Sequence, residues 1–249
     1  MLLKDQTAIV TGAARGVAKG VATAFVKAGA SVLIVDREAE LGKATCAELA
    51  EFGPVHFMAV DLADRDALPG IIDEALARFG RLDTLVNAAQ ASAQVMLADM
   101  SIAAMNIAFD TGFWPTFLLM KAAFPHLVKS QGSVINFGSG AGIEGMATQA
   151  SYGAAKEAIR SLSKTAAVEW GEHGVRVNVI CPFALSPGVE QWRMQFPEAF
   201  EGQIAKVPMR RIGDPERDIG ASAVYLASHL AAYVTGTTLM VDGGQTRRF

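Results

Sequence analysis

Seven short apolar runs alternate along this chain with longer amphipathic runs, and this alternation restricts the folds open to it. The apolar runs cover residues 7–10, 31–35, 55–60, 82–86, 133–137, 175–180 and 237–241. Strands that alternate with helices pair in parallel through right-handed crossovers, which place helices on both faces of the sheet. The sequence therefore predicts an α/β fold with a doubly wound, seven-stranded, mostly parallel sheet. It contains no repeat or linker, so we expect residues 1–249 to form a single domain.

The composition suits a sheet whose strands are buried on both faces, because 51% of the 249 residues are hydrophobic. The net charge of −3, with acids and bases interspersed, argues against a nucleic-acid surface or a polybasic membrane patch. The first ten residues show no signal-peptide pattern, and Pro115, Lys121 and Pro125 interrupt the most apolar segment. Cys46 and Cys181 match no metal or CxxC spacing, which predicts free thiols in a reducing compartment. We expect a soluble, cytoplasmic protein without nucleic-acid or membrane partners.

A glycine-rich turn, VTGAARGVA, joins the first apolar run to the helical run that follows it. Gly12 permits a tight turn, and Gly16 lets a phosphate approach the amides at a helix N-terminus. Ala18 holds the third position of such patterns, where alanine is accepted. Asp36 ends the second run twenty residues beyond Gly16, where an acid can accept from ribose hydroxyls. Glycine is common in strand-to-helix turns, and Asp36 could merely end a strand, but the combination predicts dinucleotide binding.

Asp36 also bears on the choice between NAD and NADP. A carboxylate there would repel a 2′-phosphate, which favours NAD and makes NADP the less expected cofactor. Arg15 and Arg37 argue the other way, because either guanidinium could hold a phosphate. Asp61, after the third run, could contact the adenine or could cap the following helix, and the sequence leaves both interpretations open.

Tyr152 and Lys156 lie four residues apart in the run SYGAAKEAIRSL, so they share one face of a predicted helix. A free phenol has a pKa of about 10 and is a poor base at neutral pH. A nearby ammonium would lower that pKa and allow proton exchange with an alcohol or ketone. The YxxxK pattern alone often occurs by chance. Ser139 strengthens it, because this residue follows a strand at the same edge of the sheet as the glycine turn.

Taken together, these motifs make the sequence similar to the short-chain dehydrogenase/reductase family. The resemblance extends from TGAARGVA through SYGAAK to VTGTTLMVDGG, nearly the whole chain. It implies a Rossmann fold and an NAD(P)-dependent oxidoreductase that interconverts a secondary alcohol and a ketone by hydride transfer. By this likeness, Tyr152 is the general acid/base, Lys156 lowers the pKa of Tyr152 and binds the nicotinamide ribose, and Ser139 orients the substrate oxygen.

The resemblance also implies a set of cofactor contacts and an assembly. The cofactor-binding residues implied are Gly12, Arg15, Gly16, Val17, Asp36, Asp61, Leu62, Asn87, Tyr152, Lys156 and Pro182. The implied assembly is a homotetramer with helix-to-helix interfaces, and the apolar helix around residues 112–124 is compatible with such an interface. The four histidines are scattered, so no metal site is predicted.

Four positions depart from the family pattern, and one of them is Ala88, which replaces the second asparagine of the usual Asn-Asn-Ala-Gly. Gly112 stands where the family has an asparagine that helps to hold a water on the proton path from the lysine. Gln90 replaces a glycine of the usual Asn-Asn-Ala-Gly, and Phe183 replaces the glycine after Pro182. One interpretation is an active enzyme with a rebuilt proton path; the alternative is a weak or inactive NAD-binding relative that acts through binding or assembly. Activity is favoured because Ser139, Tyr152 and Lys156 are all retained. We expect Gly112→Asn to be tolerated or to raise the rate.

The substrate pocket is expected beside Ser139 and under an irregular loop over about residues 183–211. The predicted substrate contacts are Gln90, Gly140, Glu144, Gln149, Phe183 and Trp192. Trp192, Phe196 and Phe200 are spaced four apart, so one helix could present them as a single aromatic stripe, toward the substrate or as packing of a lid. The apolar walls predict a small, largely apolar ketone or secondary alcohol.

Overall fold

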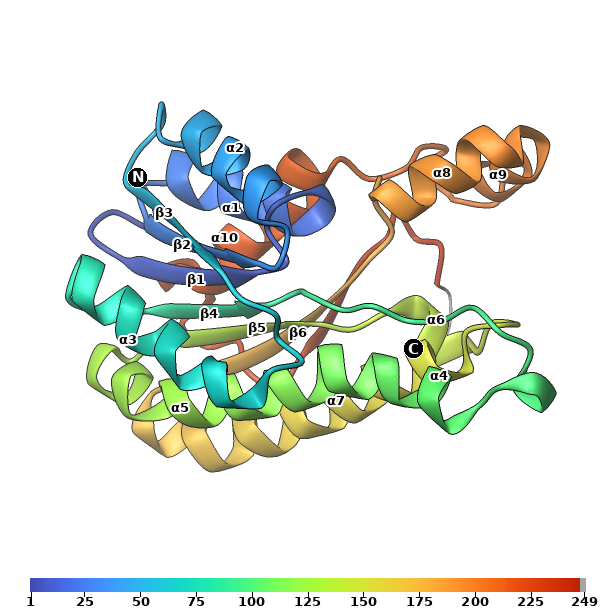
Figure 1. Cartoon of the computed structure of the whole chain (residues 1–249). Coiled ribbons are helices and arrows are strands. Elements are labelled where there is room, and N and C mark those ends of the chain that lie inside the picture. Colours follow the sequence, from blue (N-terminus) through green and yellow to red (C-terminus); the bar gives the residue numbers. More distant parts are fainter. Residues whose placement is uncertain (247–249) are drawn as a thin grey trace.

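The computed structural model describes residues 1–246 and contains one seven-stranded sheet, in the order β3-β2-β1-β4-β5-β6-β7 (Figure 1). The strands are β1(Thr7–Thr11), β2(Ser31–Asp36), β3(Val55–Ala59), β4(Thr84–Asn87), β5(Ser133–Phe137), β6(Arg176–Pro182) and β7(Thr238–Val241). All six pairings between these strands are parallel. The predicted doubly wound sheet is therefore confirmed, and it is parallel throughout.

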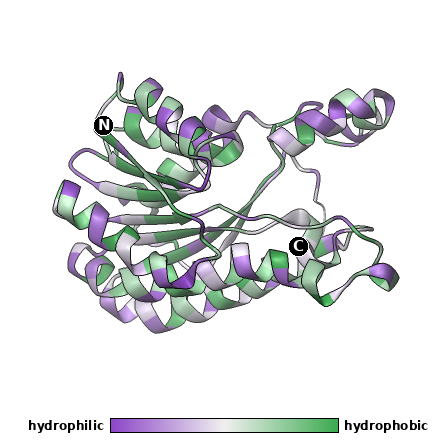
Figure 2. Ribbon diagram, viewed as in Figure 1, coloured by the Kyte–Doolittle hydropathy of each residue, from purple (hydrophilic) through white to green (hydrophobic). Residues whose placement is uncertain are grey.

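Helices cover both faces of the sheet, as predicted. The α-helices are α1(Gly16–Lys27), α2(Ala39–Leu49), α3(Leu68–Phe79), α4(Ile102–Ala108), α5(Trp114–Ser130), α6(Gly140–Glu144), α7(Ala150–Trp170), α8(Pro187–Gln195), α9(Pro197–Ile204) and α10(Ala221–Ala227). One core cluster joins the sheet to α1 and α10, and a second joins it to α3, α5 and α7. Apolar colour fills the strands in Figure 2, because both faces of the sheet are covered. Within the part of the chain described, no helix is long and apolar enough to cross a membrane.

The strand order reverses between β1 and β4, and ligands of open α/β sheets bind at such a switch point. The turn after β1 lies directly against the chain after β4. A Cβ added to Gly12 would lie 2.8 Å from the Cα of Ala89, so the two segments meet with no room for a side chain. Thr11 ties them further, because its hydroxyl accepts from Ala88 N at 3.1 Å and from Ala89 N at 3.3 Å.

The region after β4 departs from the single helix expected there. Helix α4 passes into a π-helical turn, η3(Phe109–Phe113), before α5 begins. Pro115, in the first turn of α5, has no N–H to donate to the preceding turn, so the regular ladder is interrupted before it. The π-helical turn contains Gly112 and packs against α7.

The segment 183–211 is more regular than the sequence indicated, because it contains α8 and α9. Ser186 caps α8 by accepting from Val189 N at 3.2 Å. The ring of Trp192 packs edge-on against that of Phe200, with centroids 5.4 Å apart. Phe196 lies at the break between the helices and is 57% exposed, so the predicted single stripe of three aromatic residues is wrong.

Candidate active site

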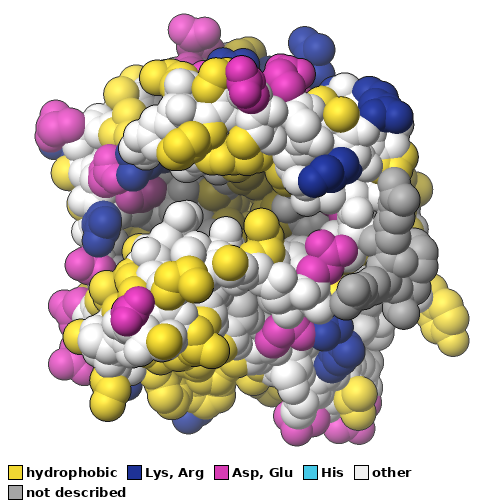
Figure 3. All heavy atoms as spheres, turned by 90° about the vertical axis from the view of Figure 1, so that its right-hand side faces the viewer, with side chains coloured by type: hydrophobic (Ala, Val, Ile, Leu, Met, Phe, Trp, Pro, Cys, Tyr) yellow, Lys and Arg dark blue, Asp and Glu magenta, His cyan; other side chains and the backbone are white. Residues whose placement is uncertain are grey.

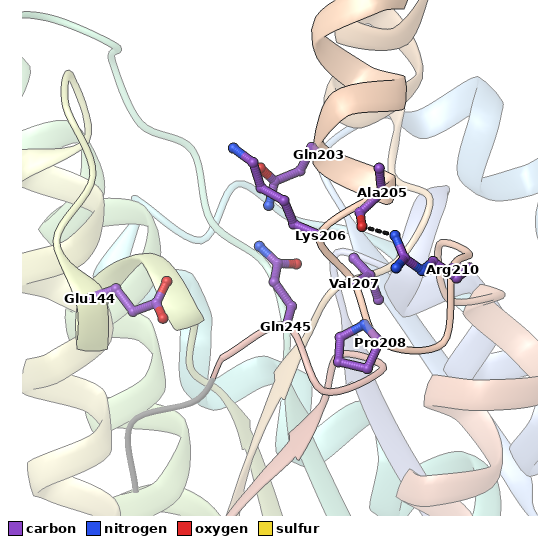
Figure 4. Close-up of a pocket in the computed structure, with 8 residues that line it drawn as sticks. All are labelled: Glu144, Gln203, Ala205, Lys206, Val207, Pro208, Arg210 and Gln245. Atoms are coloured by element: carbon purple, nitrogen blue, oxygen red, sulfur yellow. Dashed lines mark hydrogen bonds between the residues drawn. The ribbon is translucent and has the colours of Figure 1, made fainter.

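The carboxyl edge of the sheet is hollowed, with α8 and α9 above and α4 and α6 below (Figures 1 and 3). A pocket of about 530 Å³ opens between α6 and the end of α9 (Figure 4). Its lining residues are Glu144, Gln203, Ala205, Lys206, Val207, Pro208, Arg210 and Gln245. None of the three predicted catalytic residues lines this pocket, although Ser139 is the N-cap of α6, which contributes Glu144 to it.

Ser139 follows β5 and is the N-cap of α6, where its hydroxyl accepts from Ala141 N at 3.1 Å. A short polar side chain is typical of this position, because it satisfies an amide at the start of the helix. The hydroxyl also lies near enough to the phenol of Tyr152 to lower the pKa of that group. Ser139 and Tyr152 thus meet, although thirteen positions separate them in sequence, and a substrate oxygen could contact both groups.

Lys156 lies one turn after Tyr152 on α7 and is only 3% exposed. Its Nζ donates to the carbonyl oxygen of Phe137 at 2.7 Å and lies 5.6 Å from the centroid of the Tyr152 ring. Burial lowers the pKa of the ammonium from 10.5 to about 8, because water no longer solvates the charge. Lys156 is therefore a buried cation that can release a proton near neutral pH.

The predicted lowering of the pKa of Tyr152 by Lys156 is not found. Burial raises the pKa of Tyr152 above its ordinary value of 10.0, the hydroxyl of Ser139 lowers it, and the charge of Cys181 raises it. The ammonium of Lys156 donates to the Phe137 carbonyl, and its charge is not among the causes that set the pKa of Tyr152. The phenol keeps its proton and is arranged to donate it to an acceptor.

The glycine turn fits a phosphate-bearing ligand. Gly12 and Gly16 have φ values of +73° and +63°, a conformation that side chains rarely allow. Arg15, the N-cap of α1, forms no side-chain hydrogen bond to the helix, so the first amides of α1 remain available to an anion. A Cβ on Gly16 would lie 2.8 Å from Cδ of Pro187, so the turn also contacts the start of α8.

Asp36 lies beside this turn, as the spacing indicated. Its carboxylate oxygens accept from Ala14 N and from Glu38 N, both at 3.1 Å. Arg15 forms an ion pair with Glu38 at 2.6 Å, and Arg37 is exposed. The carboxylate of Asp36 is thus fixed at the end of β2. Of the two arginines that could hold a 2′-phosphate, Arg15 is ion-paired with Glu38.

The remaining predicted cofactor contacts lie at or near the same edge. Asn87 donates to the Asn136 side chain at 2.8 Å, and its own Oδ1 is buried with no hydrogen-bond partner. Asp61 is exposed and accepts from Ala63 N at 3.0 Å, whereas Asp64 caps the helical turn that leads into α3. Helix capping is therefore excluded for Asp61. Leu62 is buried, Val17 lies in the first turn of α1, and Pro182 ends β6.

Of the predicted substrate contacts, only Glu144 lines the pocket. Gln149 is the N-cap of α7, and the backbone of Phe183 is bonded to Val241 and Gly213. The side chain of Trp192 lies on α8 against Phe200, and that of Gln90 lies against Gly112. A Cβ added to Gly140 would lie 2.8 Å from the hydroxyl of Thr246.

Sequence reasoning missed four polar residues of the pocket: Gln203, Lys206, Arg210 and Gln245. The sequence did contain a signal for Gln245, because it follows β7 and all parallel strands end at the same edge. Gln203 and Lys206 lie at the end of α9, whose position above the sheet no local pattern indicated. Across residues 1–246, no three His, Cys, Asp or Glu side chains come together as metal ligands. Both cysteines are free thiols, as predicted.

The expected tolerance of asparagine at position 112 stays a prediction, because the atoms that a side chain there would meet belong to the end of the flexible Gln90 side chain. A Cβ there would lie 2.8 Å from Cδ of Gln90, so any side chain requires Gln90 to move. Neighbouring residues do not replace the missing asparagine. Asp110 is ion-paired with Arg65 at 2.8 Å, and Thr111 is hydrogen-bonded to the backbone of Ala91 and Ile107.

Comparison with known proteins shows which family the chain is similar to. The family model described as enoyl-(acyl carrier protein) reductase matches residues 12–246. The 12α-hydroxysteroid dehydrogenase of a Clostridium species is 39% identical, over 99% of each chain. The 2,5-dichloro-2,5-cyclohexadiene-1,4-diol dehydrogenase of Sphingobium indicum is 37% identical, over 97% of this chain and 96% of the relative.

Among known structures, a short-chain type dehydrogenase/reductase from Mycobacterium ulcerans superimposes with a TM-score of 0.93. It is 30% identical, and the match covers 100% of this chain and 92% of that one. The chain belongs to the short-chain dehydrogenase/reductase family and is an NAD(P)-dependent oxidoreductase that acts on CH–OH groups.

Proposed function

We propose that this oxidoreductase uses NAD to interconvert an alicyclic secondary alcohol and the corresponding ketone. The observation that carries the proposal is the proximity of Tyr152 to Ser139 and Lys156, at the same edge of the sheet as the glycine turn and the carboxylate of Asp36. In this proposal the nicotinamide, when bound, supplies or accepts the hydride at the carbonyl carbon. The protein supplies the position of the substrate and the movement of the proton.

Each of the three residues has a separate role in the proposed reaction. During ketone reduction, the neutral phenol of Tyr152 donates its proton to the substrate oxygen, and during oxidation it takes the proton back. The hydroxyl of Ser139 contacts the same oxygen and holds it within reach of the phenol. Lys156 sits behind the phenol and replaces the proton that Tyr152 gives up. Its lowered pKa supports this role, because a group that titrates near neutral pH releases protons readily.

The cofactor-binding roles follow from the same edge of the sheet. The turn between Gly12 and Gly16 would receive the pyrophosphate, and Asp36 would accept from the adenosine ribose. The unpartnered Oδ1 of Asn87 offers an acceptor, and Lys156 offers a donor to the nicotinamide ribose. Val17, Leu62, Asp61 and Pro182 remain predicted contacts, as does Arg15.

Two of the relatives support the proposed substrate class, because their names describe ring alcohols: a hydroxysteroid and a cyclohexadiene diol. The volume of the pocket, about 530 Å³, is sufficient for a molecule with several rings. Its polar lining, which includes Gln203 and Gln245, suits a substituent that can form hydrogen bonds. We therefore propose an apolar ring system that carries a polar group away from the reacting carbon.

A panel of secondary alcohols and ketones, tested with NAD and with NADP, is the direct test of this function. We expect reduction of NAD with alicyclic alcohols and much slower turnover of short linear alcohols, because only ring systems fill the pocket. The absorbance of the reduced nicotinamide measures both. Saturable binding of NAD with no turnover of any alcohol or ketone would contradict the proposal and support a binding protein instead.

Asp36→Asn tests the preference for NAD. The variant loses the negative charge and keeps the size of the side chain, so the 2′-phosphate of NADP is no longer repelled. The Kd for NADP divided by the Kd for NAD should therefore fall by roughly tenfold or more. Titration of cofactor binding by calorimetry measures both affinities. Arg37→Gln is the matched control and should change this ratio less than twofold. A wild-type protein that binds NADP more tightly than NAD would overturn the assignment.

Assembly as a homotetramer and a cytoplasmic location are also proposed, on the family resemblance. Exposed apolar side chains on the helices are compatible with such an assembly. They include Ile102 on α4, which is 81% exposed, and Val168 on α7, which is 83% exposed. The inner face of α5, including Leu119 and Ala123, packs into the core and does not contribute.

A further inference from the structure

The side chain of Gln90 occupies space that exists only because residue 112 is glycine. A Cβ built on Gly112 would lie 2.8 Å from Cδ, 2.9 Å from Oε1 and 3.0 Å from Cγ of Gln90. Contacts this short do not occur between a real Cβ and its neighbours, so the carboxamide could not stay in place beside any other residue. Two of the substitutions that distinguish this chain from its family, at positions 90 and 112, are therefore in direct contact.

The carboxamide of Gln90 is buried without a partner. Both Oε1 and Nε2 are inaccessible to solvent, and neither forms a hydrogen bond. Buried amide groups in native proteins nearly always have a partner, so an amide with two unsatisfied atoms indicates a molecule that binds there. A water molecule fits this group well, because it can donate to Oε1 and accept from Nε2 at the same time.

The neighbours of Gln90 connect it to the glycine turn and to the helix that carries Tyr152 and Lys156. On one side, the backbone of the preceding residue, Ala89, lies against Gly12. On the other side, Gly112 belongs to the π-helical turn η3, which packs against α7. The following residue, Ala91, is held to Thr111 by hydrogen bonds of 2.9 and 3.1 Å, so the backbone at this point is fixed.

In the proposed reaction, the buried Lys156 needs a route by which it can regain a proton from solvent. Lys156 is 3% exposed and forms a hydrogen bond only to the Phe137 carbonyl among the described residues. If it replaces the proton that Tyr152 gives up, its own proton must come from solvent through a carrier. An ordered water beside a buried amide is such a carrier.

We propose that Gln90 is a positioning residue: its carboxamide, seated in the space left by Gly112, holds a water molecule through which Lys156 exchanges protons with solvent. The inference rests on the proposed role of Lys156 in proton transfer. Only a proton moves in this step, from solvent to the water and from the water to the amine of Lys156. The amide itself is not changed.

Gln90→Met removes both polar atoms and keeps a side chain of similar length. We expect kcat to fall about tenfold or more and the Kd for NAD to stay within twofold, because the variant loses only the water. The limb of the pH profile of kcat that reports Lys156 should move to lower pH, since loss of the water desolvates the ammonium further. A residue that served only in packing would leave this limb unchanged.

Gly112→Ala tests the contact from the other side, because the new Cβ displaces the carboxamide without removing it. It should reproduce the loss seen for Gln90→Met, whereas Gly171→Ala, at the end of α7 with no atom within 4 Å of the added Cβ, should not. The double variant Gln90→Gly with Gly112→Asn supplies the amide from residue 112 and should recover turnover to within about threefold of the wild type, a strong non-additivity.

A crystal structure of the protein without cofactor gives a readout independent of turnover. We expect an ordered water within about 3 Å of the Gln90 amide in the wild type and none in Gln90→Met. Absence of that water, or an unchanged kcat and pH profile in Gln90→Met, would overturn the inference. A wild type that holds the water and turns over no alcohol or ketone would instead refute the proposed function.

Discussion

Tyr152→Phe is expected to lower kcat by about a thousandfold or more while the Kd for NAD changes less than threefold. The substitution removes a single oxygen, the atom that would exchange a proton with the substrate. The ring remains, so the packing of α7 and the site for the dinucleotide are expected to persist. Stopped-flow measurement of nicotinamide absorbance gives the rate, and calorimetry gives the affinity.

Tyr225→Phe is the matched control for this variant, because that tyrosine is 39% exposed on α10. It should retain wild-type turnover. Substantial turnover in Tyr152→Phe would remove the tyrosine from the proton path and would leave Ser139 as the remaining hydroxyl next to the substrate. The function would then need a different proton donor.

Lys156→Met is expected to stabilise the fold at pH 7 and to abolish turnover. Burial lowers the pKa of Lys156 from 10.5 to about 8. At about 1.4 kcal/mol per pH unit, the charged folded state is penalised by about 3 kcal/mol. Loss of the hydrogen bond from this charged donor to Phe137 costs about 1.5 kcal/mol in return, so the free energy of unfolding should rise by about 1.5 kcal/mol.

The stability that Lys156→Met gains over the wild type should decrease as pH rises. Between pH 8 and 10.5 the unfolded chain binds more protons at Lys156 than the folded chain, so the wild type gains stability as pH rises through this window. The advantage of the methionine variant is therefore full below pH 8 and disappears toward pH 10.5. Urea unfolding at pH 7 and pH 10 measures the difference. Lys164→Met, an exposed position on α7, is the control and should show no such window, and a Lys156→Met protein that is less stable at both values would contradict this account.

Much of the fold could be predicted because local patterns determine it. The run SVLIV, bounded by Gly29 and Asp36, predicted β2 almost to the residue, since apolar, mostly β-branched runs of this length rarely form anything else. The pattern of the glycine turn likewise predicted its place after β1, at the carboxyl edge of the sheet. The π-helical turn and the helices α8 and α9 were missed, because they depend on packing between distant segments.

In the candidate site, too, local patterns predicted some features, and others depend on the whole fold. The spacing of Tyr152 and Lys156 required only the geometry of a helix, and Ser139 required only the position of a strand end. The pKa of Tyr152 was predicted in the wrong direction, because the burial of the phenol arises from the whole fold. The contact of Gln90 with Gly112 joins residues far apart along the chain, so neither substitution could be understood alone.

The strand order also determines how the chain must assemble itself. Ala8 of the central strand pairs with Val32 on one side and with Thr84 on the other, and the chain between Ala8 and Thr84 must close as one long loop. Closure of long loops costs entropy before the new contacts repay it, and parallel sheets fold slowly for this reason. During synthesis, the backbone N–H and C=O groups on the β4 side of β1 therefore stay unpaired until β4 has left the ribosome, and an unpaired strand edge of this kind is prone to aggregation.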